Sequence, residues 1–152
     1  MKTSTIILIV VVVITILIFV VIYFVKDKFK LSKQVSKLKK YIAANQLPIV
    51  LSEYEKVLFC FMAIDRINKK LVYMNDIEDF STIQIYDYTT FVSCSNNIPE
   101  SRLSITEDLF LIISDKNKEI NLKIYDFSTN LSADDQILFI DSWMLKINSL
   151  IL

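Results

Sequence analysis

The chain has 152 residues, carries 17 basic and 17 acidic side chains, and contains neither glycine nor histidine. The absence of histidine excludes Ser-His-Asp triads and the commonest zinc ligand, and the absence of glycine excludes phosphate-binding loops and dinucleotide fingerprints in their standard forms. Without glycine, turns that need a positive φ are expected to use Asn or Asp, the next most tolerant residues.

The zero net charge hides two halves of opposite sign. Residues 1–45 hold eight cations and one acid, a net charge of +7, whereas residues 46–152 hold nine cations and sixteen acids, a net charge of −7. An acidic region of about 107 residues suits one small domain and argues against nucleic acid as a partner, because phosphate binding needs a basic face.

The first predicted element is a membrane anchor over residues 1–25. Ile6 to Val25 are twenty residues without a charge, and a helix of that length spans about 30 Å, the thickness of a bilayer core. The alternative is a cleaved secretory signal, but the run is long for one and no Ala-x-Ala site follows it. We therefore predict a retained, single-pass transmembrane helix with the bilayer as a partner.

Lysines dominate the segment that follows the anchor, with only Asp27 opposing them. Under the positive-inside rule, they predict that the N-terminus lies outside and that the rest of the chain is cytoplasmic. The same cations are candidates for binding lipid headgroups. They are Lys26, Lys28, Lys30, Lys33, Lys37, Lys39 and Lys40.

A lysine-rich helical stalk is predicted over residues 26–47, ending before Pro48. Four apolar residues recur in it at helical spacing: Leu31, Val35, Leu38 and Ile42. Two interpretations remain open, packing of this stripe against the chain's own domain and a short coiled coil that forms a homodimer.

A β-rich domain is predicted over residues 48–152, because the apolar segments become short, β-branched and aromatic. Asn68 is expected to turn the first hairpin, and residues 115–118 are expected to turn the clearest one. The seven predicted strands are Val57–Ile64, Leu71–Met74, Ile83–Tyr86, Thr90–Ser95, Arg102–Thr106, Leu109–Ser114 and Glu119–Phe127.

The chain is predicted to end in an amphipathic helix over residues 132–152. Asp134 and Asp135 lie where a helix dipole favours acids, and Trp143 widens the apolar stripe and is expected to be a core residue. The predicted fold class is therefore α+β: a transmembrane helix, a stalk, and a small antiparallel sandwich or barrel closed by this helix.

The sequence offers no catalytic or metal site and implies no cofactor. Tyr86 and Tyr88 are the candidates for contacting a protein partner. Cys60 and Cys94 are expected to be free thiols in a reducing compartment, and a disulfide between them would indicate the opposite topology.

Three segments carry a resemblance to a known fold. They are Phe61–Leu71, which contains Asp65 and the Asn68-Lys69-Lys70 turn, Ile85–Val92, and the terminal Asp141–Lys146. With seven strands and a closing helix, the chain resembles small bacterial single-span membrane proteins of unknown function that carry a pleckstrin-homology-like domain.

The resemblance implies a non-catalytic, membrane-anchored domain that binds a protein, because an acidic domain lacks the basic pocket used for phosphoinositides. Two alternatives are an exported envelope or phage-related component with the domain outside the cytoplasm and a membrane-tethered enzyme.

Overall fold

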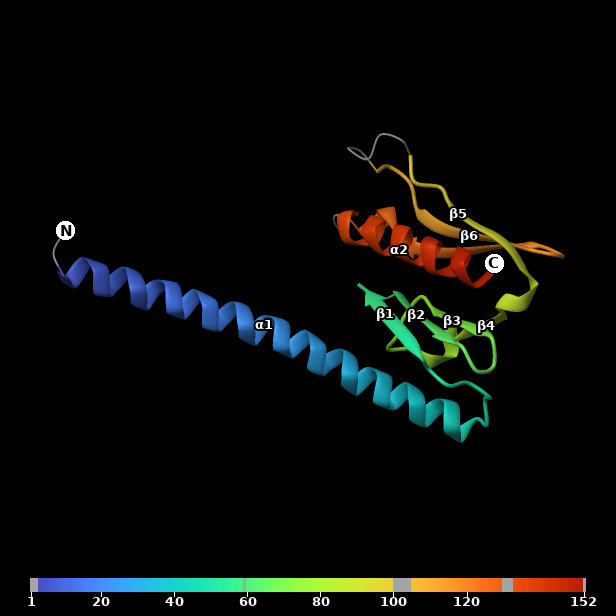
Figure 1. Cartoon of the computed structure of the whole chain (residues 1–152), viewed down its shortest axis with the longest axis horizontal. Helices are drawn as coiled ribbons and strands as arrows, with labels where there is room; N and C mark the ends of the chain where they lie inside the picture. Colours follow the sequence, from blue (N-terminus) through green and yellow to red (C-terminus); the bar gives the residue numbers. More distant parts are fainter. Residues whose placement is uncertain (1–2, 59, 100–104, 130–132, 152) are drawn as a thin grey trace. The chain divides into compact units, whose positions relative to one another are not determined.

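The computed structural model describes residues 3–58, 60–99, 105–129 and 133–151, and for residues 3–9, 20, 23–28 and 129 it describes the backbone without the side chain. The chain forms two compact units, Met1–Ala44 and Asn45–Leu152. The first unit is a single helix and the second holds all the strands (Figure 1).

Helix α1 runs from Thr3 to Ala44 without a break, so the predicted stalk and the apolar run before it are one helix. Just beyond its end, Gln46 has a φ of 52°, a left-handed conformation that ends helices. Pro48 follows two residues later, and a proline cannot continue the helix. The helix therefore ends near the position that the sequence predicts.

The prediction of a membrane span is wrong. Among the described residues, no helix is both long enough and apolar enough to cross a bilayer. The transmembrane part of the predicted fold class, the single-pass topology and the predicted localisation depended on this span and are wrong with it.

In the described part of the second unit, seven strands form two antiparallel sheets. The four-stranded sheet has the order β1-β2-β3-β4, with β1 at Glu53–Val57, β2 at Cys60–Asp65, β3 at Lys70–Met74 and β4 at Gln84–Asp87. The three-stranded sheet has the order β5-β6-β7, with β5 at Phe91–Asn96, β6 at Leu109–Asp115 and β7 at Glu119–Tyr125. Short 3-10 helices lie at Phe80–Thr82, Tyr88–Thr90 and Phe127–Thr129.

Two strand predictions need correction. The predicted strand Val57–Ile64 is the end of β1 and most of β2, because the chain reverses at Leu58, whose φ is 48°. A continuous apolar run hid this hairpin. In the predicted strand Arg102–Thr106, residues 102–104 lie outside the described residues, and Ile105 and Thr106 are not in a strand.

The expectation that Asn and Asp would supply the positive φ angles is also wrong. The described residues with positive φ are Gln46, Leu58 and Lys69. In the β2–β3 turn, Asn68 instead donates its side-chain amide to Asp65 at 2.7 Å, and the next residue, Lys69, takes the left-handed conformation with a φ of 57°.

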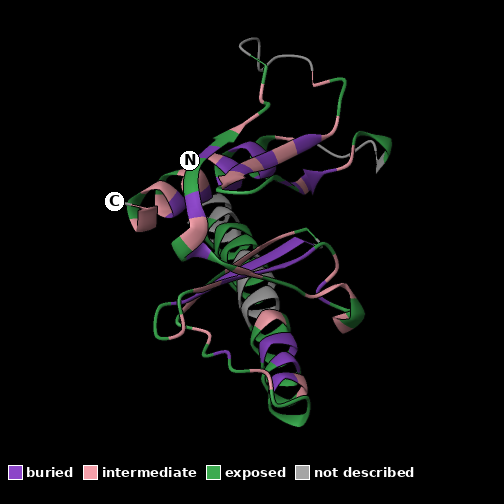
Figure 2. Cartoon of the chain, turned by 90° about the vertical axis from the view of Figure 1, so that its right-hand side faces the viewer, coloured by how far each residue is buried: buried purple, intermediate pink, exposed green. Residues whose placement is uncertain are grey.

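Helix α2, Asp134–Ile151, lies beside β5 and β6 and supplies one wall of the core (Figure 1). Trp143, Ile140 and Ile147 on α2 are fully buried, as are Met62 and Leu111 from the two sheets. The buried colour in Figure 2 follows the strands that contribute to this core. The prediction that Trp143 is a core residue is confirmed.

Candidate protein-interaction site

The structure places the two candidate tyrosines in different environments. Tyr88 lies in the 3-10 helix after β4 and is buried. Tyr86 lies in β4, is half-buried, and donates its hydroxyl to the side-chain oxygen of Gln84. Burial raises the pKa of Tyr86 above its ordinary value. Of the pair, only Tyr86 lies where a partner can reach it.

Among the described strands, β4 pairs with β3 alone and is therefore an open edge of the four-stranded sheet. The backbone N–H of Tyr88 donates to the Lys69 carbonyl at 3.1 Å, so Lys69 and Tyr88 are a hydrogen-bonded pair. In an antiparallel ladder, pairs that exchange hydrogen bonds alternate with pairs that do not. This register directs the N–H and C=O of Ile85 and the N–H of Asp87 away from β3 and toward the open edge. Ile85 is 38% exposed, and Gln84 and Asp87 are also exposed.

The corresponding edge of β5 is covered by a side chain from α2. The Asn148 amide accepts a hydrogen bond from the backbone N–H of Cys94 and donates one to its carbonyl, both at 2.9 Å. A primary amide offers a donor and an acceptor together, so Asn148 substitutes for one residue of a neighbouring strand. Polar Asn148 next to the apolar stripe of α2 is a signal that the sequence analysis missed.

The edge of β7 is covered in the same way from the other sheet. The Tyr73 hydroxyl, which comes from β3, donates to the Lys123 carbonyl at 2.6 Å. Burial raises the pKa of Tyr73, with further contributions from nearby Cys60 and Tyr86. The tyrosine is therefore a protonated donor at all ordinary pH values, and it ties β7 to the four-stranded sheet.

Strand β1 is fastened to α2 through one carboxylate. Glu55 accepts the indole N–H of Trp143 at 2.9 Å and forms an ion pair with Lys146. The Lys146 ammonium also lies 4.9 Å from the centre of the Trp143 ring. Residues of β1 other than Tyr54 are half-buried, whereas Gln84, Ile85 and Asp87 of β4 are exposed, so β4 is the more exposed edge of this sheet among the described strands.

The predicted lysine cluster lies on α1. Lys30, Lys33, Lys37, Lys39 and Lys40 are exposed, whereas the side chains of Lys26 and Lys28 are outside the described part of the chain. Their predicted role at lipid headgroups depended on an adjacent membrane span and has lost that support. Homodimerisation through Leu31, Val35, Leu38 and Ile42 stays a prediction.

Both cysteines are free and buried. Burial raises the pKa of the Cys94 thiol to about 12 and raises that of Cys60 as well, so neither is a thiolate nucleophile at neutral pH. Within the described ranges, no group of three or more cysteine or acidic side chains is arranged to hold a metal ion.

The chain matches no protein-family model, no curated protein and no solved structure. Its functional assignment therefore depends on the geometry of its own sheets and edges.

Proposed function

We propose that Asn45–Leu152 is a protein-interaction domain that binds an extended peptide segment by adding it as a strand to β4. The observation that supports this proposal is that some strand edges are covered by side chains and the edge of β4 is not covered among the described residues. Asn148 and Tyr73 occupy the edges of the three-stranded sheet, whereas outward backbone groups of β4 have no such cover among the described residues. Strand addition uses these groups for affinity and neighbouring side chains for specificity.

The side chains around this edge favour an aliphatic residue in the partner. Ile85 stands directly opposite Val72 of β3, so an added strand would extend this apolar row by one position. Asp87 does not present an unpaired charge there, because Lys70 donates to its carboxylate at 2.8 Å. The partner segment therefore needs an uncharged, branched side chain opposite Ile85.

The resemblance to pleckstrin-homology-like domains agrees with this proposal. The resemblance implies a small domain of seven short strands followed by a closing C-terminal helix. Many such domains bind proteins, and this inference rests on fold analogy.

The proposal is tested with peptides selected from a random library on the full-length chain. Ile85→Pro removes an N–H that points outward and no hydrogen bond to β3, so the fold should survive the change. It should lower the affinity of the selected peptides by about tenfold or more, because one hydrogen bond is lost and the proline ring occupies the edge. Ile85→Thr keeps the N–H and a β-branched shape, and it should weaken binding much less.

Hydrogen exchange gives an independent readout. The amides of Ile85 and Asp87 should exchange quickly in the free chain and slowly with peptide bound, whereas the Tyr86 amide, which bonds to β3, should change little. Selected peptides that bind Ile85→Pro as well as the native chain, or that protect other edges, would refute strand addition at β4.

A further inference from the structure

The outward backbone groups of β4 are arranged so that the strand can pair with a second copy of itself. Ile85 stands opposite Val72 at a position that exchanges no hydrogen bonds with β3, so both its N–H and its C=O point to the open edge. In an antiparallel ladder, such a residue pairs with another whose N–H and C=O also point outward, and the two exchange both hydrogen bonds. Ile85 of a second copy satisfies this condition, because a two-fold axis brings each donor opposite the acceptor of the other copy.

The apolar side chains on one face of the sheet also match across such an axis. They form a row that crosses the sheet from Tyr54 through Ala63 and Val72 to Ile85. Tyr54 and Ile85, at the two ends of the row, are 39% and 38% exposed, whereas Ala63 and Val72 are fully buried. An added strand needs an uncharged, branched side chain opposite Ile85, and Ile85 of the second copy is such a side chain. Pairing would therefore join two rows into one and cover the exposed end of each.

On the other face of the sheet, the paired side chains would be uncharged as well. With Ile85 opposite Ile85, Gln84 lies opposite Tyr86 of the second copy. Within one copy, the Tyr86 hydroxyl donates to the side-chain oxygen of Gln84, and burial raises the pKa of this tyrosine, so it is protonated at neutral pH. The Gln84 amide keeps its NH₂ group as a donor for the tyrosine oxygen of the second copy. No charges are therefore opposed at the centre of the pairing.

The charge of Asp87 favours this register over the neighbouring one. Centred on Tyr86, the pairing would place Asp87 opposite Ile85 and would leave the two Asp87 residues two steps apart along the strands, about 7 Å. Salt does not fully screen two like charges at this separation, because the screening length is about 8–10 Å. Centred on Ile85, the pairing leaves them four steps apart, about 14 Å. Each carboxylate also stays 2.8 Å from the Lys70 ammonium of its own copy.

We infer that β4 of a second copy occupies this edge and forms a two-fold dimer in which the two four-stranded sheets become continuous. The pairing uses the β4 edge of both copies, so assembly stops at the dimer. Where it concerns peptides, the inference rests on the proposed function: one edge accepts one strand, so the second copy and a peptide exclude each other. Each copy contributes only four residues of strand, and such a small interface should give a Kd of about 100 µM.

Sedimentation equilibrium of the full-length chain tests the dimer. The native chain should change from monomer to dimer between about 5 and 500 µM, without larger species. Ile85→Pro removes one outward N–H from each copy, so it should weaken the dimer by about a hundredfold, compared with about tenfold for a peptide. Circular dichroism verifies that the variant is folded.

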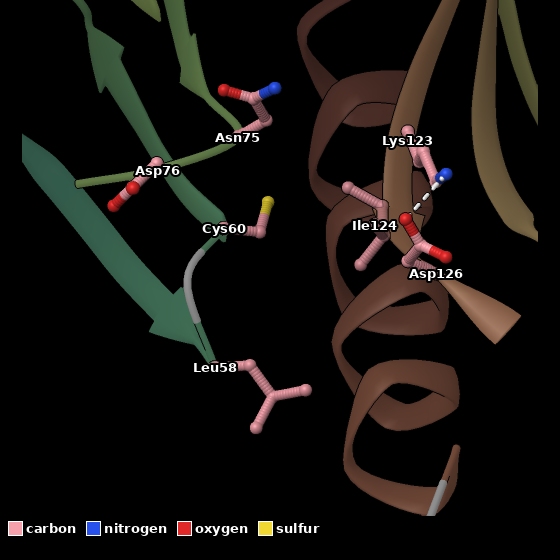
Figure 3. A pocket seen from close by; sticks show the side chains of 7 residues that line it. All are labelled: Leu58, Cys60, Asn75, Asp76, Lys123, Ile124 and Asp126. Carbon is pink, nitrogen blue, oxygen red and sulfur yellow. Dashed lines mark hydrogen bonds and ion pairs between the residues drawn. The ribbon is translucent and has the colours of Figure 1, made fainter. Parts of the chain in front are cut away.

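Leu58 provides a matched control for loss of an exposed apolar side chain. It lies at the β1–β2 turn, beside a cavity between the two sheets (Figure 3), and on the other side of the sheet from β4. Its side chain is 41% exposed, close to the value for Ile85. Leu58→Asn suits the φ of 48° at this position and should leave the dimer unchanged.

Hydrogen exchange on the native chain identifies the residue that pairs. The Ile85 amide should exchange quickly at about 5 µM and slowly at about 500 µM, whereas the Tyr86 amide, which bonds to β3, should change little. A peptide selected for β4 should convert the dimer into a complex of one chain with one peptide.

Four outcomes would each overturn the inference: a native chain that stays monomeric at about 500 µM, a dimer that Ile85→Pro leaves intact, assemblies larger than a dimer, or an Ile85 amide that stays unprotected. Peptides that bind a chain without dimerisation would support the proposed function and overturn this inference. A dimer with a protected Ile85 amide, for which no peptide is selected, would support this inference and count against the proposed function.

Discussion

Asp65 is the residue whose replacement should reveal most about this fold. It ends β2, is fully buried, and its carboxylate receives four hydrogen bonds. Oδ1 accepts the N–H groups of Ile67 and Asn68, both at 2.9 Å, and Oδ2 accepts the Val50 N–H and the Asn68 amide, both at 2.7 Å. The turn and the segment leading into β1 therefore converge on one side chain.

Asp65→Asn keeps the size of the side chain and removes one acceptor. Whichever way the amide points, its NH₂ group faces two N–H donors that have lost their acceptor. Hydrogen bonds to a charged group contribute about 1.5–3 kcal/mol each, and a buried donor left without a partner costs about 1–3 kcal/mol. We expect the free energy of unfolding to fall by about 2–4 kcal/mol, because the turn can relax toward water and recover part of the loss.

Urea denaturation followed by circular dichroism measures this change. Asp79→Asn is the matched control, since Asp79 caps an exposed 3-10 helix by accepting the Ser81 N–H, and Asn serves as well as Asp at such a position. The control should change stability by less than about 0.5 kcal/mol. A loss below about 1 kcal/mol for Asp65→Asn, or one equal to that of the control, would refute the account of the turn.

The effect should also depend on pH. Burial acts to raise the pKa of Asp65, but the N–H donors of Asn68, Val50 and Ile67 outweigh it and hold the pKa below its ordinary value. A carboxylate with a lower pKa in the folded state stabilises the fold above its unfolded pKa, about 3.9, and loses this contribution as the pH falls. The difference between the native chain and Asp65→Asn should be constant from about pH 5 to 8 and shrink below about pH 4.

Three further changes test other parts of the structure. Asn148→Ala removes both hydrogen bonds to the Cys94 backbone and should lower the free energy of unfolding by about 1–3 kcal/mol in urea, whereas Ser149→Ala on the exposed side of α2 should cost far less. Lys69→Gly should raise the unfolding free energy by about 0.5–1 kcal/mol in the same assay, because its φ of 57° suits glycine; a loss would contradict the assigned turn. Iodoacetamide at pH 8 should label Cys60 and Cys94 slowly in the folded chain and quickly in urea, and fast labelling of the folded chain would show that the thiols are accessible.

The elements that the sequence predicted well are those specified by local pattern. Alternation of Ile120, Leu122 and Ile124 with polar residues predicted β7, and all three are buried while Asn121 is exposed. Helical spacing likewise predicted α2. The β1–β2 hairpin was missed because it turns at Leu58, a residue with no turn propensity, inside a run that reads as one apolar strand.

The candidate site was harder to predict because edges depend on contacts between distant segments. Tyr86 and Tyr88 are two residues apart, yet one lies in β4 and the other is buried in a 3-10 turn. Asn148 covers an edge 54 residues away, and Tyr73 covers one 50 residues away. Periodicity describes which face of a strand is apolar, but it carries no information on which strands become edges.

The edge of β4 is open, whereas the edges of β5 and β7 are covered. An uncovered strand edge is an aggregation hazard, and proteins limit it with short strands, charges, prolines or covering groups. The chain covers β5 and β7 with specific side chains, while among the described residues β4 has only its four-residue length and Asp87, whose charge is engaged by Lys70. An edge this short offers few backbone hydrogen bonds. A segment that contributed only its backbone would therefore bind weakly. Selectivity must then come from the side chain placed next to Ile85, while the comparison of Ile85→Pro, which removes the outward N–H, with Ile85→Thr, which keeps it, measures the contribution of the backbone.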